Sequence, residues 1–309
     1  MNLVLGVMYF GTRQDERTSF ELLDRFVDGG GTVIDTANAY SFWTDPSGLG
    51  GQSEALLGRW FAARPGMRDR VVLSSKVGAA PRVPGGYPDN VEGLSAAAIK
   101  AAVHGSLERL GTDRIDLYWA HIDDRSVPIE ETVQAFGSLV SSGVVRRLGA
   151  SNHATWRVER ARQVARTCGA AAYSALQLRH TYLQPRPGVP VHDHPHGSVT
   201  AETLDYARAE QLDIWAYTPL LSGSYVRPDR PLPEAYDHPG TTRRLAVLDD
   251  VAAELGATRN QVVLAWLSGG FPAITPIVGV STVPQLDDAL GAARRMLSDD
   301  QRCRLDAAK

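Results

Sequence analysis

The segment VIDTANAY, residues Val33 to Tyr40, ends an apolar run on an acid, Asp35, and reaches a tyrosine five residues later. Aspartate is seldom fully buried in a protein unless a partner compensates its charge. A core strand that ends on a carboxylate therefore predicts a polar site at the end of that strand. The architecture of the remaining chain decides which other polar groups lie beside it.

Short apolar runs like this one alternate with longer amphipathic stretches along the whole chain. Their apolar character is continuous, which is typical of parallel strands buried on both faces. Eight such strands alternating with helices favour a closed (β/α)8 TIM barrel of the α/β class over an open sheet. No linker interrupts the pattern, so we expect a single domain over residues 1–309. The expected strands are Leu3–Val7, Thr32–Asp35, Val71–Ser75, Ile115–Ala120, Val144–Ala150, Ser174–Gln177, Asp213–Tyr217 and Ile274–Gly279.

The stretches between these runs carry helix signals. One of them opens on Ser95, a residue suited to an N-cap, and stops at Gly111, a residue suited to the helix end. Two longer stretches, 179–198 and 219–240, have no such signals and follow a strand. In a barrel both loops rise from the C-terminal face of the strands, where active sites are built.

The composition excludes several functional classes. The formal net charge is −3, from 32 Lys and Arg against 35 Asp and Glu, which gives no reason to expect nucleic acid or an anionic membrane as partner. No apolar run is long enough for a membrane helix. The first residues carry no signal-peptide pattern, and two cysteines form no disulfide framework, so we expect a cytoplasmic protein.

Four titratable groups fall at the C-terminal ends of three successive strands. Asp35 ends the second strand, and Tyr40 lies on the loop behind it. Lys76 directly follows the third strand, and His121 follows the fourth. Each residue alone has an ordinary explanation, as a turn cap, a solvated loop residue or a structural histidine. Since strand ends meet at one mouth of a barrel, their joint occurrence favours an active site.

The residue types indicate the chemistry. Free tyrosine titrates near pH 10, and a nearby ammonium lowers that pKa by favouring tyrosinate. A carboxylate keeps the lysine charged and holds it in place. A histidine can donate a hydrogen bond to an oxygen that gains negative charge. Such a set suits carbonyl reduction, in which Tyr40 protonates the alkoxide, and it requires a nicotinamide as hydride donor.

Three segments resemble the aldo-keto reductase family in combination. They are IDTANAYSFWTDPSGLGGQSEALLG from Ile34, LGTDRIDLYWAHIDD from Leu110 and PIEETVQAFGSLVSSGVVRRLGASN from Pro128. The resemblance covers nearly the whole chain. It implies a (β/α)8 barrel and NAD(P)H-dependent reduction of a small-molecule carbonyl compound. It also implies the catalytic tetrad Asp35, Tyr40, Lys76 and His121.

The resemblance further implies a set of cofactor contacts. Ser151, Asn152 and Gln177 match positions that bind the nicotinamide carboxamide, and Tyr217 matches the aromatic that stacks on the nicotinamide ring. The segment that resembles the pyrophosphate loop comprises Thr218, Pro219, Leu220, Leu221, Ser222 and Gly223. The positions that match contacts to the adenosine end are Gly279, Ser281 and Gln285.

Other interpretations of these contacts stay open. Tyr217 fits a packed strand aromatic, and Ser151 with Asn152 fits an N-cap before a helix near Thr155. Many relatives carry Arg or Lys at the position of Ser281, where it binds the 2′-phosphate of NADPH. A serine hydroxyl with the amides of a helix N-terminus also binds phosphate, so we expect NADPH and keep NADH open.

Two segments depart from the family pattern. An apolar and aromatic insertion, Ser41–Gly50, lengthens the loop after Tyr40 and fits a pocket wall or a packed surface loop. The stretch HDHPH, His192–His196, allows a metal site, but the prolines and the lack of helical spacing favour a flexible loop, so we expect no metal. The residues that we expect in the substrate pocket are Tyr9, Phe10, Trp43 and Trp119.

Two other functions compete with carbonyl reduction. A nucleotide-binding regulatory subunit on the same fold would turn over slowly or not at all. A barrel hydrolase or lyase would use the carboxylate and histidine on a metal. The sequence sets neither the particular carbonyl compound nor the oligomeric state.

Overall fold

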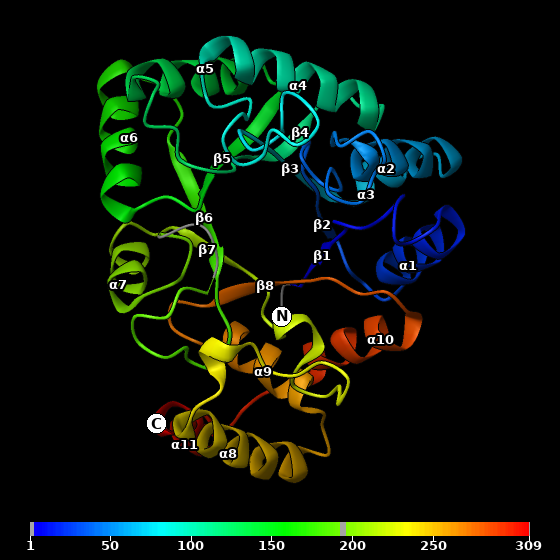
Figure 1. Cartoon of the computed structure of the whole chain (residues 1–309), viewed down its shortest axis with the longest axis vertical. Coiled ribbons are helices and arrows are strands. Elements are labelled where there is room, and N and C mark those ends of the chain that lie inside the picture. The colour runs from blue at the N-terminus through cyan, green and yellow to red at the C-terminus, as the bar shows by residue number, and fades with distance from the viewer. Residues whose placement is uncertain (1–2, 192–195, 309) are drawn as a thin grey trace. The chain divides into compact units, whose positions relative to one another are not determined.

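The computed structural model describes residues 3–191 and 196–308, and the eight strands of this part of the chain form a closed barrel in the order β1 to β8 (Figure 1). The strands alternate with helices, which confirms the predicted (β/α)8 fold. By its internal contacts the chain divides into two compact units, Leu5–Gln177 and Met1–Val4 with Leu178–Lys309. The expectation of one domain over the whole chain stays a prediction.

The unit Leu5–Gln177 holds the strands that end at the predicted tetrad. Neighbouring strands pair in parallel, and α2 packs against α4, α4 against α5 and α5 against α6 (Figure 1). The elements are α1 (Glu16–Asp28), β2 (Val33–Asp35), α2 (Gln52–Ala63), α3 (Met67–Arg70), β3 (Val72–Val77), α4 (Ala96–Leu110), β4 (Ile115–Ala120), α5 (Ile129–Ser141), β5 (Val145–Ser151) and α6 (Thr155–Cys168). Two strands cross the unit boundaries, β1 (Val4–Gly6) and β6 (Tyr173–Arg179).

The predicted helix signals act where the sequence places them. The side chain of Ser95 accepts a hydrogen bond from the backbone N–H of Ala98 and so caps α4. The helix ends at Gly111, whose φ of 61° is left-handed and therefore suits glycine. α6 begins without a side-chain cap, and its N-cap position is Ala154. The N-cap residue of this helix is therefore neither Ser151 nor Asn152.

The parallel register brings the ends of the strands together. Asp35 pairs with Ser74, Lys76 with Trp119, and Ser151 with Gln177. β3 runs two residues further than predicted, so Lys76 lies inside the strand and not behind it. Trp119 packs over the neighbouring strand at Gly149, where an added Cβ would lie 2.2 Å from its ring.

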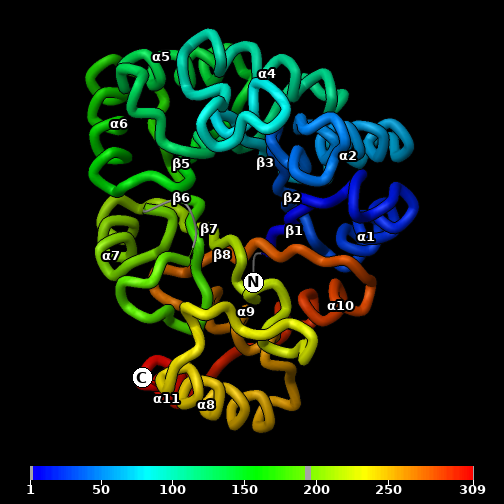
Figure 2. The backbone as a smooth tube through the Cα atoms, in the orientation of Figure 1, coloured from blue at the N-terminus to red at the C-terminus, as the bar shows by residue number. Residues whose placement is uncertain are grey.

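The other unit carries the two long predicted loops, which follow β6 and β7 (Figure 2). Within it, α8 packs against α9 and α11, and α9 packs against α10. Its helices and strands are α7 (Ala201–Ala209), β7 (Asp213–Tyr217), α8 (Pro239–Leu255), α9 (Arg259–Ser268), β8 (Ile274–Val278), α10 (Val283–Gly291) and α11 (Asp299–Ala307). The described part of this unit also has three short 3-10 helices, at Leu221–Gly223, Glu234–Tyr236 and Ala292–Arg294.

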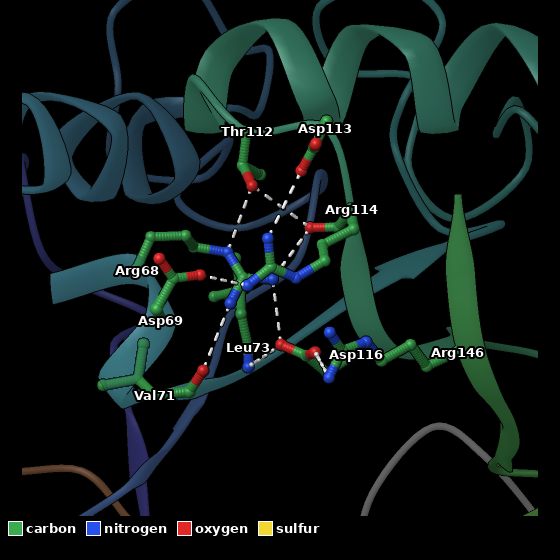
Figure 3. Close-up of polar contacts among 9 residues, drawn as sticks. All are labelled: Arg68, Asp69, Val71, Leu73, Thr112, Asp113, Arg114, Asp116 and Arg146. Atoms are coloured by element: carbon green, nitrogen blue, oxygen red, sulfur yellow. Dashed lines mark hydrogen bonds and ion pairs between the residues drawn. The ribbon is translucent and has the colours of Figure 1, made fainter. Parts of the chain in front are cut away.

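A polar network ties the N-terminal ends of β3 and β4 (Figure 3). Arg68 on α3 donates hydrogen bonds to the carbonyl oxygens of Val71 and Arg114 and forms an ion pair with Asp116 at 2.9 Å. Asp116 also accepts a bond from the backbone N–H of Leu73. These bonds join α3, β3 and β4 at the end of the barrel strands opposite Lys76.

Candidate active site

Strand alternation explains why Lys76 reaches Asp35. Side chains two apart on a strand point to the same face, so Ser74 and Lys76 share one face of β3 and Ser75 takes the other. The register sets Ser74 directly beside Asp35 on β2. The strand therefore delivers a hydroxyl and an ammonium to the same carboxylate.

The ammonium of Lys76 is buried and makes three hydrogen bonds. Its Nζ donates to Asp35 Oδ2 at 2.5 Å, to the carbonyl oxygen of Thr36 at 2.7 Å and to the hydroxyl oxygen of Tyr40 at 2.8 Å. An ammonium has three N–H groups, so these acceptors use its whole donor capacity. Lys76, Asp35 and Tyr40 are thus joined directly through one nitrogen.

Asp35 receives two further donors that the sequence analysis missed. Ser74 Oγ donates to Asp35 Oδ1 at 2.5 Å, and Gln177 Nε2 donates to the same oxygen at 3.2 Å. The period-two pattern of β3 predicts Ser74 on the face of Lys76. No sequence pattern predicts the bond from Gln177, because that residue lies on β6.

Tyr40 and His121 complete the predicted tetrad. Their ring centroids lie 6.0 Å apart with the rings nearly perpendicular. The Tyr40 hydroxyl reaches Asp35 Oδ2 only at 3.5 Å, which is long for an O–H donor. Both side chains are half-buried, whereas Asp35 and Lys76 are buried. The structure thus brings all four predicted residues together in one unit.

Burial opposes the charge on Lys76. Removal from water lowers the pKa of Lys76, while the neighbouring carboxylate of Asp35 raises it and Glu54 adds a smaller effect of the same sign. The lysine therefore depends on its acidic partners to stay protonated, and its charge is directed at the hydroxyl of Tyr40.

Glu54 is a second buried acid that the sequence analysis did not select. It lies on α2, accepts a hydrogen bond from Ser75 Oγ and forms an ion pair with Arg109 on α4 at 2.7 Å. Ser75 is the outward neighbour of Lys76 on β3. The Glu54 contacts therefore fasten two helices to the strand that carries the lysine.

The residues predicted to hold the nicotinamide lie at the ends of β5 and β6. Ser151 and Gln177 are buried and face each other in the register. Asn152 adopts a left-handed φ of 59°, and its amide donates to the carbonyl oxygen of His121 at 3.0 Å and to Ser151 Oγ at 3.1 Å. These side chains form a group of hydroxyl and amide functions linked to the tetrad.

In the other unit, the predicted pyrophosphate loop has an unusual backbone. Thr218, Leu221 and Ser222 all have positive φ, at 56°, 46° and 57°, followed by Gly223 at 98°. Non-glycine residues in this region are strained, and such strain concentrates at functional sites. Successive turns of this kind gather backbone N–H groups into a concavity suited to anions.

The predicted adenosine segment opens α10. Thr282 caps this helix, and the backbone N–H of Ser281 donates to the side chain of Gln285 at 2.8 Å. Gly279 and Ser281 are exposed. Tyr217 ends β7 and is half-buried, so neither the packed nor the stacking interpretation is excluded by its burial.

The four expected pocket residues differ in exposure. Trp43 is 43% exposed and Tyr9 is half-buried. Phe10 and Trp119 are buried, with 1% and 0% of their surface exposed. Substrate contact for all four stays a prediction, and for Phe10 and Trp119 the structure shows a packing role.

The comparisons with known proteins bear on this site. The model of the Aldo/keto reductase family matches residues 2–309. The chain belongs to the aldo/keto reductase family. This confirms the resemblance found in the sequence, and it makes the chain an NAD(P)H-dependent oxidoreductase whose substrates are small carbonyl compounds.

Three relatives in this family illustrate the range of chemistry around the chain. It is 33% identical to the uncharacterized oxidoreductase YrpG of Bacillus subtilis (strain 168), over 96% of this chain and 91% of that protein. It is 31% identical to norsolorinic acid reductase stcV of Emericella nidulans, over 97% of this chain and 76% of that protein. It is 30% identical to aryl-alcohol dehydrogenase GME11368 of Pestalotiopsis microspora, over 84% of this chain and 64% of that protein.

Within residues 3–191 and 196–308, no helix combines the length and the hydropathy of a membrane span. The same residues contain no group of three or more His, Cys, Asp or Glu that could hold a metal ion. The predicted flexible loop at 192–196 lies outside the described residues except for His196, which is exposed.

Proposed function

We propose that the protein reduces an aldehyde or ketone with NADPH and that Tyr40 donates the proton. The observation that carries the proposal is the position of Lys76 Nζ, 2.5 Å from Asp35 Oδ2 and 2.8 Å from the Tyr40 hydroxyl. A single buried ammonium thus connects a carboxylate to the one hydroxyl of the tetrad. Carbonyl reduction needs this arrangement, because the donor becomes an anion when its proton leaves.

The residues at the ends of β5 and β6 fit a nicotinamide. The hydroxyl of Ser151 and the amides of Asn152 and Gln177 supply donors and acceptors that match a primary carboxamide. In the other unit, the backbone of Thr218–Gly223 fits a pyrophosphate. The helix N-terminus behind Ser281 fits a 2′-phosphate, which supports NADPH over NADH. A bound NADPH supplies the hydride that reaches the carbonyl carbon.

Tyr40 is the proton donor in this proposal. Its hydroxyl oxygen accepts from Lys76, so the hydroxyl keeps its own hydrogen to donate to a substrate oxygen. When that proton moves to the forming alkoxide, the phenolate left behind lies 2.8 Å from a buried ammonium. Charge stabilisation is strong in such a place, because little water screens it. A proton from solvent restores Tyr40 for the next turnover.

His121 orients the carbonyl group. Its ring stands close to that of Tyr40, so a carbonyl oxygen placed at the Tyr40 hydroxyl lies within reach of the imidazole. The Asn152 amide donates to the backbone oxygen of His121 and so ties the nicotinamide residues to the histidine.

The two exposed free cysteines, Cys168 and Cys303, fit the cytoplasmic location that we propose.

Replacement of Tyr40 by phenylalanine tests the proposal. We expect Tyr40→Phe to lower kcat for a reactive aldehyde by about a thousandfold, because the general acid is lost. Binding of NADPH, followed by quenching of protein fluorescence, should persist. Tyr173→Phe is the matched control, because Tyr173 lies at the N-terminal end of β6, away from Gln177. This variant should keep the wild-type activity.

Three outcomes are informative. Full turnover by Tyr40→Phe would refute the proton-donor role. Binding of NADPH without consumption over a broad set of carbonyl compounds, in the wild type, favours the regulatory subunit instead. Equal KM values for NADPH and NADH contradict the preference for the 2′-phosphate.

A further inference from the structure

Four aromatic rings gather on the loops that follow β1, β2 and β3. The ring of Trp43 meets those of Tyr9 and Phe42 edge to face, with centroids 6.2 Å and 4.8 Å away. Phe42 in turn lies 5.1 Å from Tyr87, between ring centroids. We call Tyr9, Phe42, Trp43 and Tyr87 the aromatic cluster. Two of its members lie in the inserted loop directly behind Tyr40.

Ser41 fastens this cluster to the catalytic tyrosine. It follows Tyr40 in the chain, is buried and has a left-handed φ of 75°. Its Oγ donates to the carbonyl oxygen of Met8 at 2.7 Å and lies 3.1 Å from Thr12 Oγ1. The loop behind β1 is thereby held to the loop behind β2. Trp43 is three residues from Tyr40, so their Cα atoms are at most about 11 Å apart.

The exposure of Trp43 distinguishes the cluster from ordinary core packing. Trp60 and Trp119 of the same unit are fully buried, whereas 43% of Trp43 is open to water. A tryptophan that is fixed by aromatic neighbours and still exposed offers a rigid apolar face. A ligand ring gains most from such a face, since it covers apolar surface without ordering a mobile side chain.

A cation stands at the edge of the same cluster. The guanidinium carbon of Arg13 lies 4.4 Å above the ring of Tyr9, and the residue is exposed. Over the described ranges, no carboxylate lies within ion-pair distance of Arg13. The ring attracts the cation but does not neutralise it. Its charge is therefore available to an anionic group on a ligand.

We propose that the aromatic cluster and Arg13 select an aromatic carbonyl compound that carries a carboxylate or a similar anionic group. The substrate ring packs on Trp43, its carbonyl group reaches Tyr40, and its anionic group faces Arg13. The proposal rests on the proposed function and adds the substrate class. It goes beyond the family pattern, because Trp43 lies in the segment Ser41–Gly50 that departs from that pattern.

Four aldehydes separate the two features of this substrate. They are 4-carboxybenzaldehyde, its methyl ester, 4-oxobutanoate and butanal. In the wild type we expect kcat/KM for 4-carboxybenzaldehyde to exceed that of the ester about fivefold, the scale of a partly exposed cation–anion contact. The kcat/KM for 4-carboxybenzaldehyde should also exceed that for 4-oxobutanoate about tenfold, because the aliphatic acid has no ring to pack on Trp43. The first ratio should shrink as salt rises, because screening weakens the charge pair.

Two variants assign each ratio to a residue. Arg13→Gln should bring the ratio of carboxylate to ester close to one and remove its salt dependence. Trp43→Ala should bring the ratio of aromatic to aliphatic acid close to one, and Trp43→Phe should restore most of it. The matched controls are Arg17→Gln and Trp156→Ala. Arg17 is an exposed arginine on α1, and Trp156 is an exposed tryptophan on α6 whose ring lies near the guanidinium of Arg125. Both controls should keep the wild-type ratios.

The outcomes separate this inference from the proposed function. Equal kcat/KM values for the four aldehydes, or wild-type ratios in Arg13→Gln and Trp43→Ala, overturn the substrate class while reduction by Tyr40 stands. Absence of turnover with all four aldehydes, or full turnover by Tyr40→Phe, overturns the proposed function and the substrate class with it. Circular dichroism of each variant shows that the fold is retained.

Discussion

The strand β3 lies between two buried charge pairs, one at each end. At its C-terminal end Lys76 pairs with Asp35, and each side chain is 1% exposed. At its N-terminal end Arg68 pairs with Asp116, and the exposed fractions are 13% and 9% (Figure 3). Burial acts on both cations in the same way, since it lowers the pKa of Lys76 and the pKa of Arg68.

The partners of the two cations differ. Besides its ion pair with Asp116, Arg68 donates to the backbone carbonyls of Val71 and Arg114, which cannot change their charge, so these bonds fasten chain segments. Lys76 donates to the Tyr40 hydroxyl, which can lose a proton. An arginine stays charged even where burial lowers its pKa, whereas the protonation of a lysine responds readily to burial. Similar burial therefore serves structure at one end of the strand and proton transfer at the other.

Removal of the Lys76 pair gives the largest expected effect on activity. The double variant Asp35→Asn with Lys76→Met should lower kcat for aldehyde reduction by about a thousandfold. Its free energy of unfolding, measured with urea, should fall by about 1 kcal/mol at most, since one backbone acceptor, the carbonyl oxygen of Thr36, loses its donor. Replacement of a buried ion pair by neutral groups of similar size is often neutral or stabilising. A large loss of stability would show that this pair holds the fold, and would remove the contrast.

Removal of the Arg68 pair should have the opposite consequence. The double variant Arg68→Met with Asp116→Asn loses the bonds to Val71 and Arg114 as well as the ion pair. We expect the free energy of unfolding to fall by about 3 kcal/mol, since two backbone acceptors lose their donor. Its kcat should stay within about twofold of the wild type. A thousandfold loss of kcat in the folded variant would contradict the division of roles.

The tetrad was predictable because strand order decides which strand ends meet. Asp35, Lys76 and His121 follow three successive apolar runs, so parallel pairing alone brings them to one mouth. The bond from Gln177 to Asp35 was not predictable, since it depends on side-chain distances between strands far apart in the sequence. The carbonyl acceptors of Arg68 leave no sequence signal either, because every residue has one.

One of the predicted strands contains two charged residues, and the structure shows why. The expected strand Val144–Ala150 is interrupted by Arg146 and Arg147, which suit a buried strand poorly. The structure keeps the strand as β5 and exposes both arginines, and Arg146 lies 3.4 Å from Asp116 as part of the network in Figure 3. The charged residues in this strand therefore reflect the ion pair between Arg146 and Asp116, which the apolar pattern alone does not reveal.

The half-buried His180 sharpens the comparison, because no counter-charge acts on it among the described residues. Burial alone lowers the pKa of His180 from 6.5 to about 4, and its ring lies 5.8 Å from that of Trp266. The unfolded chain then binds more protons than the folded one between these values, so stability falls as the pH drops from about 6.5 toward 4. Linkage gives a loss of up to about 2 kcal/mol between pH 7 and pH 5.

Urea unfolding at both pH values measures this loss. His180→Phe keeps a ring against Trp266 and should reduce the pH dependence by that amount. His104→Gln removes an exposed histidine and should leave the pH dependence unchanged. An unaltered pH dependence in His180→Phe would show that the histidine is not held neutral by burial.

The smallest effect belongs to the outer edge of the Arg68 network. Arg114 forms an ion pair with Asp69, but 75% of the Asp69 side chain is exposed, so water and salt screen the charges. The variant Asp69→Asn should therefore leave the urea midpoint unchanged within measurement error, at low and at high salt. Asp116→Asn, measured alongside, should shift the midpoint clearly, since its partner Arg68 is largely buried. Equal shifts in both variants would mean that burial does not decide the strength of these pairs, and the contrast between the two ends of β3 would then need another cause.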